Sequence, residues 1–292
     1  MHEHSSPQPS SALEVVPLDP LLLDALHVLL RTHLPLIPDW ISLAQLTNVL
    51  DVGCGLQNWG RDLYHVMIEQ AGEALVTDVR ILGIEQDEVL VRLANSQTRS
   101  SRGNVIAQQA DVYQLPASLT GRFDLVHVRF LSPWVTPADW PALLEAMSRV
   151  CKPGGWVLWT EPTLPTMREQ TPAWNQWLIW LEQVLVFSGG GIIPGEQMER
   201  VLAQAGPWRR VEQQTRHLPL STYSRLHCML TNDEVQRLGE WLHLLLPCLH
   251  AANVATPAML TTGVEQVVQE LRMRQVDSLW AWHTISGQRG ER

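Results

Sequence analysis

The stretch Asn48-Val-Leu-Asp-Val-Gly-Cys-Gly-Leu-Gln-Asn-Trp59 decides the fold of this chain. A short apolar run carries the carboxylate of Asp51 and breaks into a loop with glycines at positions 53 and 55, and a helical pattern over 58–70 follows directly. This order is typical of a buried parallel strand that turns into a helix through a glycine loop, a common cradle for a nucleotide-like cofactor. A Cβ atom at either glycine would occupy the space that a ligand needs close to the backbone.

Strand and helix patterns alternate through the rest of the first half. Apolar runs predict strands over 48–52, 81–84, 104–110, 123–128 and 156–160, and helical patterns cover 20–32, 58–70, 88–97 and 140–150. This alternation predicts an α/β fold with a Rossmann-like, doubly wound, mostly parallel sheet that binds ligands at the carboxyl ends of its strands. Gly53, Glu85, Asp111 and Arg129 all fall at such ends.

The second half predicts helical insertions and further strands. Helices are expected over 171–187, 195–205, 232–246 and 257–274, and strands over 208–218 and 277–286, which would complete a seven-stranded sheet. The predicted organisation is a flexible tail (1–15), an N-terminal helical segment (16–40), a cofactor-binding core (41–162), a helical insertion (163–195), a continuation of the core (196–218), a second insertion (219–274), and a final strand and tail (275–292). We expect the two insertions to form a helical lid.

Composition limits the functional classes. The chain has 292 residues, 45% of them hydrophobic and 17% charged, which suits a soluble globular protein. A net charge of -9 argues against a nucleic-acid partner. No apolar run reaches the roughly 20 residues of a membrane span, and the first residues lack the basic and apolar regions of a secretion signal.

Cysteine usage predicts the redox environment. Cys54, Cys151, Cys228 and Cys248 are scattered without close pairing, which is typical of free thiols in a cytoplasmic protein and predicts no disulfide framework and no metal site. The sequence leaves the oligomeric state open, a homodimer included.

Five sequence blocks, taken in order, resemble class I S-adenosylmethionine-dependent methyltransferases. They are Val49-Leu-Asp-Val-Gly-Cys-Gly55, Gly83-Ile-Glu85, Gln109-Ala-Asp111 with Leu115-Pro116, Phe123-Asp-Leu-Val-His127, and Arg149-Val-Cys-Lys-Pro-Gly-Gly-Trp156. The last two, together with Asp139-Trp140-Pro141, are closest to the branch found in secondary metabolism. The resemblance covers about residues 45–162. Gln57 stands where the family often has a third glycine, and there it would narrow the approach to the loop or contribute its own hydrogen bond.

The resemblance implies S-adenosylmethionine as the cofactor. Its expected contacts are Gly53, Gly55, Asn58, Glu85, Gln86, Asp111, Val112 and Arg129. Glu85 would accept hydrogen bonds from both ribose hydroxyls, and Asp111 would accept the adenine amino group unless it merely caps a helix. Arg129 would pair with the methionine carboxylate or, alternatively, form a surface ion pair. Asp51 would orient the amides of the loop.

The expected chemistry makes few demands on catalytic side chains. Methyl transfer from a sulfonium is an in-line displacement, for which positioning and exclusion of water matter most, and a base is needed only if the acceptor must lose a proton. Candidate catalytic residues are His127, Glu161 and Tyr223, although His127 could instead be buried with its nitrogens satisfied locally. The segment 129–134 lacks an Asp-Pro-Pro-Tyr type motif, which disfavours methylation of adenine or of a glutamine amide.

The acceptor is indicated only by aromatic residues. Trp174, Trp177 and Trp180 would share one helical face, which either packs on the core or forms the wall of a pocket for a hydrophobic, planar or prenylated molecule. We therefore expect a methyltransferase that acts on a hydrophobic small molecule, within a lid-covered pocket, in secondary metabolism. One alternative is a protein of the same fold that binds the cofactor without methyl transfer, as a cyclase or a regulatory binding protein. Another is a nicotinamide oxidoreductase.

Overall fold

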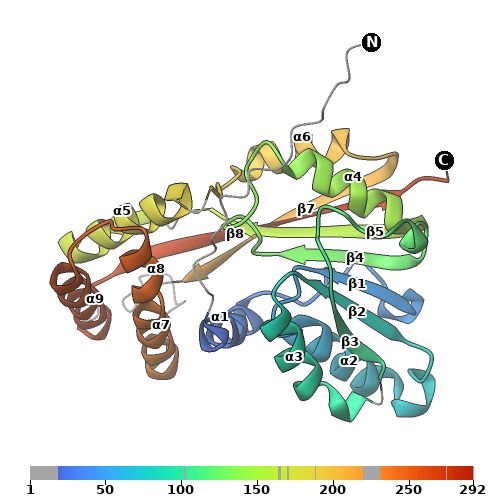
Figure 1. Ribbon diagram of the computed structural model, residues 1–292, viewed down its shortest axis with the longest axis horizontal. Helices are drawn as coiled ribbons and strands as arrows, with labels where there is room; N and C mark the ends of the chain where they lie inside the picture. The colour runs from blue at the N-terminus through green and yellow to red at the C-terminus, as the bar shows by residue number, and fades with distance from the viewer. Residues whose placement is uncertain are drawn as a thin grey trace.

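A computed structural model of the protein describes residues 19–101, 103–163, 166–169, 171–187, 189–219, 231–273 and 275–291. One mixed β-sheet runs through these residues (Figure 1). Its strands are β1 (Asn48–Val52), β2 (Arg80–Glu85), β3 (Val105–Gln109), β4 (Phe123–Arg129), β5 (Cys151–Pro162), β6 (Thr166–Glu169), β7 (Trp208–Pro219) and β8 (Asp277–Arg289).

The order of the strands is that of a Rossmann-like sheet with an antiparallel extension. The path runs β3-β2-β1-β4-β5-β8-β6, and β7 pairs with the other edge of β8. Strands β1 to β5 are parallel, whereas β6 and β7 are antiparallel to β8. The predicted α/β fold and mostly parallel sheet are confirmed. The sheet differs from the predicted seven strands by β6, an additional strand of four residues that pairs with one end of β8 and is too short for a periodic signal.

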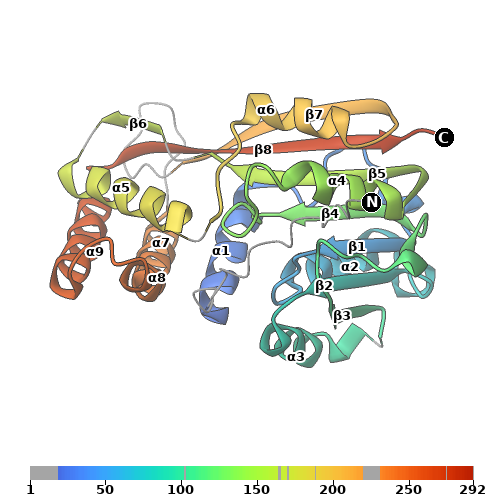
Figure 2. The ribbon, with the colours of Figure 1, turned by 45° about the horizontal axis from the view of Figure 1, so that its top comes forward.

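Helices cover both faces of the parallel part (Figure 2). The described residues form the helices α1 (Pro20–His33), α2 (Asn58–Ala71), α3 (Glu88–Gln97), α4 (Trp140–Val150), α5 (Pro172–Phe187), α6 (Gly195–Gln204), α7 (Asn232–Leu244), α8 (Leu246–Ala251) and α9 (Pro257–Arg272). Alternate residues of the strands supply the two cores: Val49 and Leu125 pack on the side of α2, and Leu50 and Val126 on the side of α4 and α6. None of these helices has the length and apolar character that crossing a bilayer requires.

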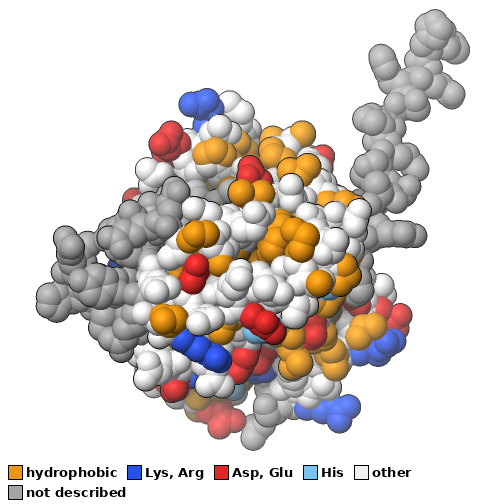
Figure 3. Space-filling model, turned by 90° about the vertical axis from the view of Figure 1, so that its left-hand side faces the viewer, with side chains coloured by type: hydrophobic (Ala, Val, Ile, Leu, Met, Phe, Trp, Pro, Cys, Tyr) orange, Lys and Arg blue, Asp and Glu red, His pale blue; other side chains and the backbone are white. Residues whose placement is uncertain are grey.

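Strand β8 extends past the parallel strands to a separate group of helices. Helices α5, α7, α8 and α9 gather at this end (Figure 1), where Trp280 and Trp282 of β8 are buried. Trp174, Trp177 and Trp180 are at most 5% exposed and belong to the same core, so this helical face packs inward. The surface of this end carries hydrophobic side chains in small groups among polar ones (Figure 3).

Helix α1 lies between this group of helices and the parallel sheet. Its first turn is fixed by Asp19, whose side chain accepts the backbone N–H of Leu21 at 2.9 Å, and by Pro20 at the first helical position. Leu22 and Leu29 are buried in the core that α5, α7 and α9 share. The adjacent side of α1 faces the carboxyl ends of the strands, which places this helix over the candidate site.

Candidate functional site

A cavity of about 630 Å³ lies at the carboxyl ends of the parallel strands, covered by α1. Its walls come from four strand ends and from Leu23, Leu26, His27 and Leu30 of α1. The volume falls within the range of small-molecule sites. No described residue of the segments 163–195 and 219–274 lines the cavity, so α1 takes the place expected for the helical insertions.

The glycine loop forms the floor of this cavity. Gly53 and Gly55 have φ values of 68° and 53°, in the left-handed region that glycine adopts without strain. A Cβ atom on Gly53 would lie 2.7 Å from Cδ1 of Leu131. The backbone N–H of Gly53 donates to the carbonyl of Ile84 at 2.8 Å, and that of Gly55 donates to the carboxylate of Glu85 at 3.0 Å. The loop is therefore held in place by β2.

Two carboxylates line the cavity beyond the tips of neighbouring strands. Glu85 accepts two further backbone N–H groups, from Gln86 at 2.8 Å and Asp87 at 3.1 Å, while burial raises the pKa of its carboxyl. Asp111 accepts the side-chain amide of Gln86 at 3.0 Å and the backbone N–H of Tyr113 at 2.9 Å. The pairing of β2 with β3 puts the two acids on the same rim.

Asp51 interacts with a histidine and not with the loop, which corrects the sequence-based expectation. Its Oδ1 lies 2.7 Å from Nδ1 of His127, because the two residues are paired in register on β1 and β4. The imidazole stacks on Trp59 with ring centroids 3.7 Å apart. Burial lowers the pKa of His127, so the neutral ring donates its Nδ1–H to Asp51.

Arg129 is a cation without a carboxylate partner. Its Nη2 donates to Nδ1 of His27 at 2.8 Å, and it forms no ion pair with any carboxylate in the described part of the chain. Burial lowers the pKa of Arg129 to about 10, which leaves the guanidinium charged at neutral pH. Since Arg129 lines the cavity, its charge is available to an anionic group of a ligand.

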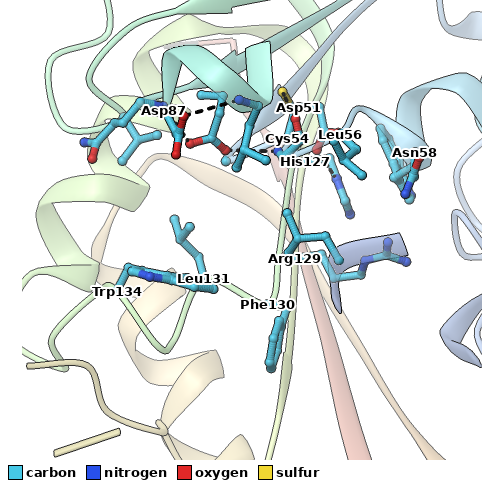
Figure 4. A pocket seen from close by; sticks show the side chains of 18 of the residues that line it. Asp51, Cys54, Leu56, Asn58, Asp87, His127, Arg129, Phe130, Leu131 and Trp134 are labelled. Atoms are coloured by element: carbon cyan, nitrogen blue, oxygen red, sulfur yellow. Dashed lines mark hydrogen bonds and ion pairs between the residues drawn. The ribbon is translucent and has the colours of Figure 1, made fainter. Parts of the chain in front are cut away.

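The residues that follow Arg129 form an apolar wall. Phe130 has a φ of 57°, unusual for a residue with a side chain, and its ring meets that of Trp134 edge to face at 6.3 Å. Leu131 and Val135 continue this wall. Figure 4 shows Asp51, Cys54, Leu56 and Asn58 along one side of the cavity and Phe130, Leu131 and Trp134 along the other, with Arg129 between them.

The predicted site residues do not all meet in the cavity. All eight residues predicted for the cofactor line it, and so does His127. Glu161 does not: it is completely buried behind the apolar wall, where its carboxylate accepts the backbone N–H groups of Leu131 at 2.8 Å and Ser132 at 3.2 Å and the hydroxyl of Ser132. This placement corrects the expectation that Glu161 faces the site. Tyr223 lies outside the described residues.

Gln57 turns away from the cavity. It adopts a φ of 59° and is completely buried, and its amide lies beneath the loop, where a Cβ atom on Gly60 would come within 2.6 Å of its Nε2. The amide atoms have no hydrogen-bond partner among the described residues. The side chain therefore neither narrows the cavity nor offers it a hydrogen bond, contrary to both expectations from the sequence.

Comparison with known proteins finds a methyltransferase domain in part of the chain. Residues 49–155 match the family model described as a methyltransferase domain. This part of the chain is therefore similar to a methyltransferase domain. The match agrees with the methyltransferase resemblance of the sequence blocks. It begins in β1 and ends in β5, so it covers the strands whose ends form the cavity.

Curated relatives match the methyltransferase domain over limited lengths. The demethylmenaquinone methyltransferase of Lactococcus lactis is 26% identical over 143 residues, which are 49% of this chain and 51% of that protein. The methyltransferase grgD of a Penicillium species is 36% identical over 55 residues, 18% of this chain and 19% of that protein. The chain thus spans about half the length of these relatives, or less.

Solved structures share the fold over most of the chain. Phosphoethanolamine N-methyltransferase 2 of Haemonchus contortus, in complex with S-adenosyl-L-methionine, has a TM-score of 0.51 and 16% identity over 92% of this chain and 52% of that one. A Bacillus halodurans protein described as a methyltransferase has a TM-score of 0.50 and 12% identity over 92% of this chain and 98% of that one. At these identities the likeness shows that the methyltransferase fold is shared.

Proposed function

We propose that the chain is an S-adenosylmethionine-dependent methyltransferase that acts on a hydrophobic small molecule in secondary metabolism, by in-line transfer within the cavity under α1. The observation that carries the proposal is the division of the cavity into two unlike walls. Hydrogen-bonding groups and a glycine loop occupy one side, apolar side chains occupy the other, and the cation Arg129, which has no carboxylate partner among the described residues, lies between them.

The polar wall fits S-adenosylmethionine group by group. The cofactor carries a diol, an exocyclic amine and a carboxylate. Glu85 and Asp111 offer acceptors for the first two, and Arg129 offers a positive charge for the third. The left-handed glycines at 53 and 55 leave room where a Cβ atom would intrude. When bound, the cofactor supplies a methyl group activated by the sulfonium charge.

The apolar wall supports a hydrophobic acceptor. Phe130, Trp134 and Val135 line the cavity, and so do Leu26 and Leu30 of α1. Contact with aromatic and aliphatic side chains removes an apolar ligand from water, which makes its binding free energy more favourable. The same side chains keep water away from a displacement reaction. The sequence blocks around 123–127, 139–141 and 149–156 support the assignment to secondary metabolism.

Calorimetric titration with S-adenosylhomocysteine tests the cofactor. We expect micromolar binding that Glu85→Ala weakens by more than about tenfold, the loss expected of a charged hydrogen-bond acceptor. Glu88→Ala is the matched control, because this exposed side chain pairs with Arg92 on the outer surface of α3 and does not line the cavity. Failure of the unaltered protein to bind S-adenosylhomocysteine would contradict the proposal.

Turnover separates the enzyme from a cofactor-binding protein without methyl transfer. The protein would be incubated with S-adenosylmethionine and a panel of planar and prenylated amines, phenols and carbon acids, and S-adenosylhomocysteine would be quantified by mass spectrometry. Acceptor-dependent release is the expected result. For the acceptor found, Trp134→Ala should raise KM about tenfold while the affinity for S-adenosylhomocysteine changes less than about threefold, because the indole lies on the apolar wall. Tight cofactor binding with no release across the panel would favour the non-catalytic alternative.

A further inference from the structure

His27 of α1 bridges two charged side chains from separate parts of the fold. Its Nδ1 lies 2.8 Å from Nη2 of Arg129 on β4, and its Nε2 lies 3.1 Å from the carboxylate of Asp62 on α2. Arg31, one turn further along α1, also donates to Asp62 at 3.2 Å. His27 itself is 6% exposed and lines the cavity.

The two partners determine the tautomer of His27. A guanidinium can only donate, so Nδ1 must be the unprotonated nitrogen that accepts, and the proton must lie on Nε2, which donates to Asp62. Burial lowers the pKa of His27, and the charge of Arg129 adds to this effect, so the ring is neutral. Asp62 thereby fixes the orientation of an imidazole whose lone pair is directed at Arg129.

Holding Arg129 in this way matters for an anionic ligand group. An arginine side chain has many rotamers, and ordering it during binding costs conformational entropy. The bond to His27 uses one of the five N–H donors of Arg129 and leaves the others for a ligand. Because His27 is neutral, it orders the guanidinium and leaves its positive charge in place. A carboxylate in the same position would neutralise that charge.

We infer that His27 is a positioning residue, which orients the guanidinium of Arg129 for the carboxylate of the amino-acid portion of S-adenosylmethionine. This inference rests on the proposed function. It makes α1 a part of the cofactor site as well as its cover, and it gives Asp62, which does not line the cavity, an indirect part in binding.

Two ligands that differ in one portion test this inference. S-adenosylhomocysteine carries the amino-acid carboxylate, whereas 5′-methylthioadenosine keeps the adenosine and the thioether but lacks the amino-acid group. We expect His27→Leu to lower the affinity for S-adenosylhomocysteine about tenfold and the affinity for methylthioadenosine less than about twofold, because only the first ligand has a carboxylate that Arg129 can bind. His27→Asn should restore most of the loss, since its amide oxygen replaces Nδ1 as the acceptor. Equal losses for both ligands would overturn the inference.

A double-mutant cycle identifies the residue through which His27 acts. In an Arg129→Gln background, His27→Leu should cause no further loss of affinity for S-adenosylhomocysteine, whereas a general structural role would add to the effect of Arg129→Gln. His33→Asn is the control on the same helix, because His33 pairs with Glu234 of α7 at 3.0 Å and does not line the cavity. If His27→Leu does not fold, His27→Phe takes its place, because it fills the ring volume without an acceptor.

The outcomes separate this inference from the function on which it rests. If the unaltered protein binds neither ligand, the proposed function fails. If it binds both and His27→Leu leaves the affinity for S-adenosylhomocysteine unchanged, the proposed function stands and the positioning role is refuted.

Discussion

Asp51 and His127 are joined by a buried hydrogen bond of 2.7 Å between neighbouring strands at the inner end of the cavity. The bond pairs the carboxylate of the first sequence block with the histidine of the fourth. Both residues are at most 3% exposed. The relationship explains why an acidic residue stands within an otherwise apolar strand.

Removing this carboxylate should destabilise the protein. Asp51→Ala leaves the Nδ1–H of His127 buried without an acceptor, and an unsatisfied buried donor costs about 1–3 kcal/mol. Asp51→Asn keeps an acceptor oxygen and should lower the free energy of unfolding by less than Asp51→Ala does. Urea unfolding followed by circular dichroism measures both changes, and equal stabilities for the Ala and Asn variants would show that the bond contributes little.

Glu161 should make stability depend on pH. Burial raises the pKa of its carboxyl to about 7 in the folded protein, above its value in the unfolded chain. The folded state therefore retains a proton that the unfolded state has lost, so the contribution of Glu161 to the free energy of unfolding is complete below about pH 4 and falls as the pH rises to about 7.

The Glu161→Gln variant isolates this contribution, because glutamine does not titrate. Relative to the variant, the unaltered protein should lose stability between about pH 4 and pH 7, by an amount on the order of 3 kcal/mol. Urea unfolding across that range gives the difference. A difference that stays constant with pH would show that Glu161 titrates as an ordinary carboxyl.

Gly53→Ala should impair ligand binding, because the Cβ atom of the introduced alanine would contact the side chain of Leu131. The new Cβ would meet Leu131 at 2.7 Å, in a backbone with a φ of 68°. We expect the affinity for S-adenosylhomocysteine to fall more than about tenfold, because either the loop or the side chain of Leu131, both of which line the cavity, must shift. Gly121→Ala has a similar φ of 63° and no atom within 4 Å of the new Cβ, so it reproduces the strain without the contact. Equal effects of the two substitutions on binding would refute this explanation.

Restoring the third glycine should leave the cofactor site unchanged. The side chain of Gln57 lies beneath the loop and does not line the cavity, so Gln57→Gly should alter the affinity for S-adenosylhomocysteine by less than about twofold. The same titration that serves Gly53→Ala measures this. An increase of tenfold or more would mean that Gln57 restricts the loop in solution.

The sequence predicted the parallel sheet and the polar rim well, because each depends on local pattern. Buried strands read as apolar runs, and the residues after them, such as Glu85 and Asp111, must meet at one edge of a parallel sheet. Side-chain alternation would also have placed Glu161 on the same side of β5 as Trp159, against α4 and away from the cavity.

The cover of the site could not be predicted in this way. An amphipathic helix has an apolar side in its sequence, but the pattern does not say which part of the fold that side will contact. Both α1 and the tryptophan-rich α5 are helices with buried apolar residues, and only the packing of complete elements places α1 over the cavity and α5 at one end of β8. His27 gave no signal, because its partners Asp62 and Arg129 are 35 and 102 positions away.

Leu26 and Leu30 belong at once to the wall of the cavity and to the core of the distant helices. A change of side-chain volume in α7 or α9 would shift α1 and with it the surface that an acceptor meets. Substitutions at positions that contact no ligand would thus change the selectivity for the acceptor among proteins related to this chain. The glycine loop and the acidic residues at the rim of the cavity would stay the same.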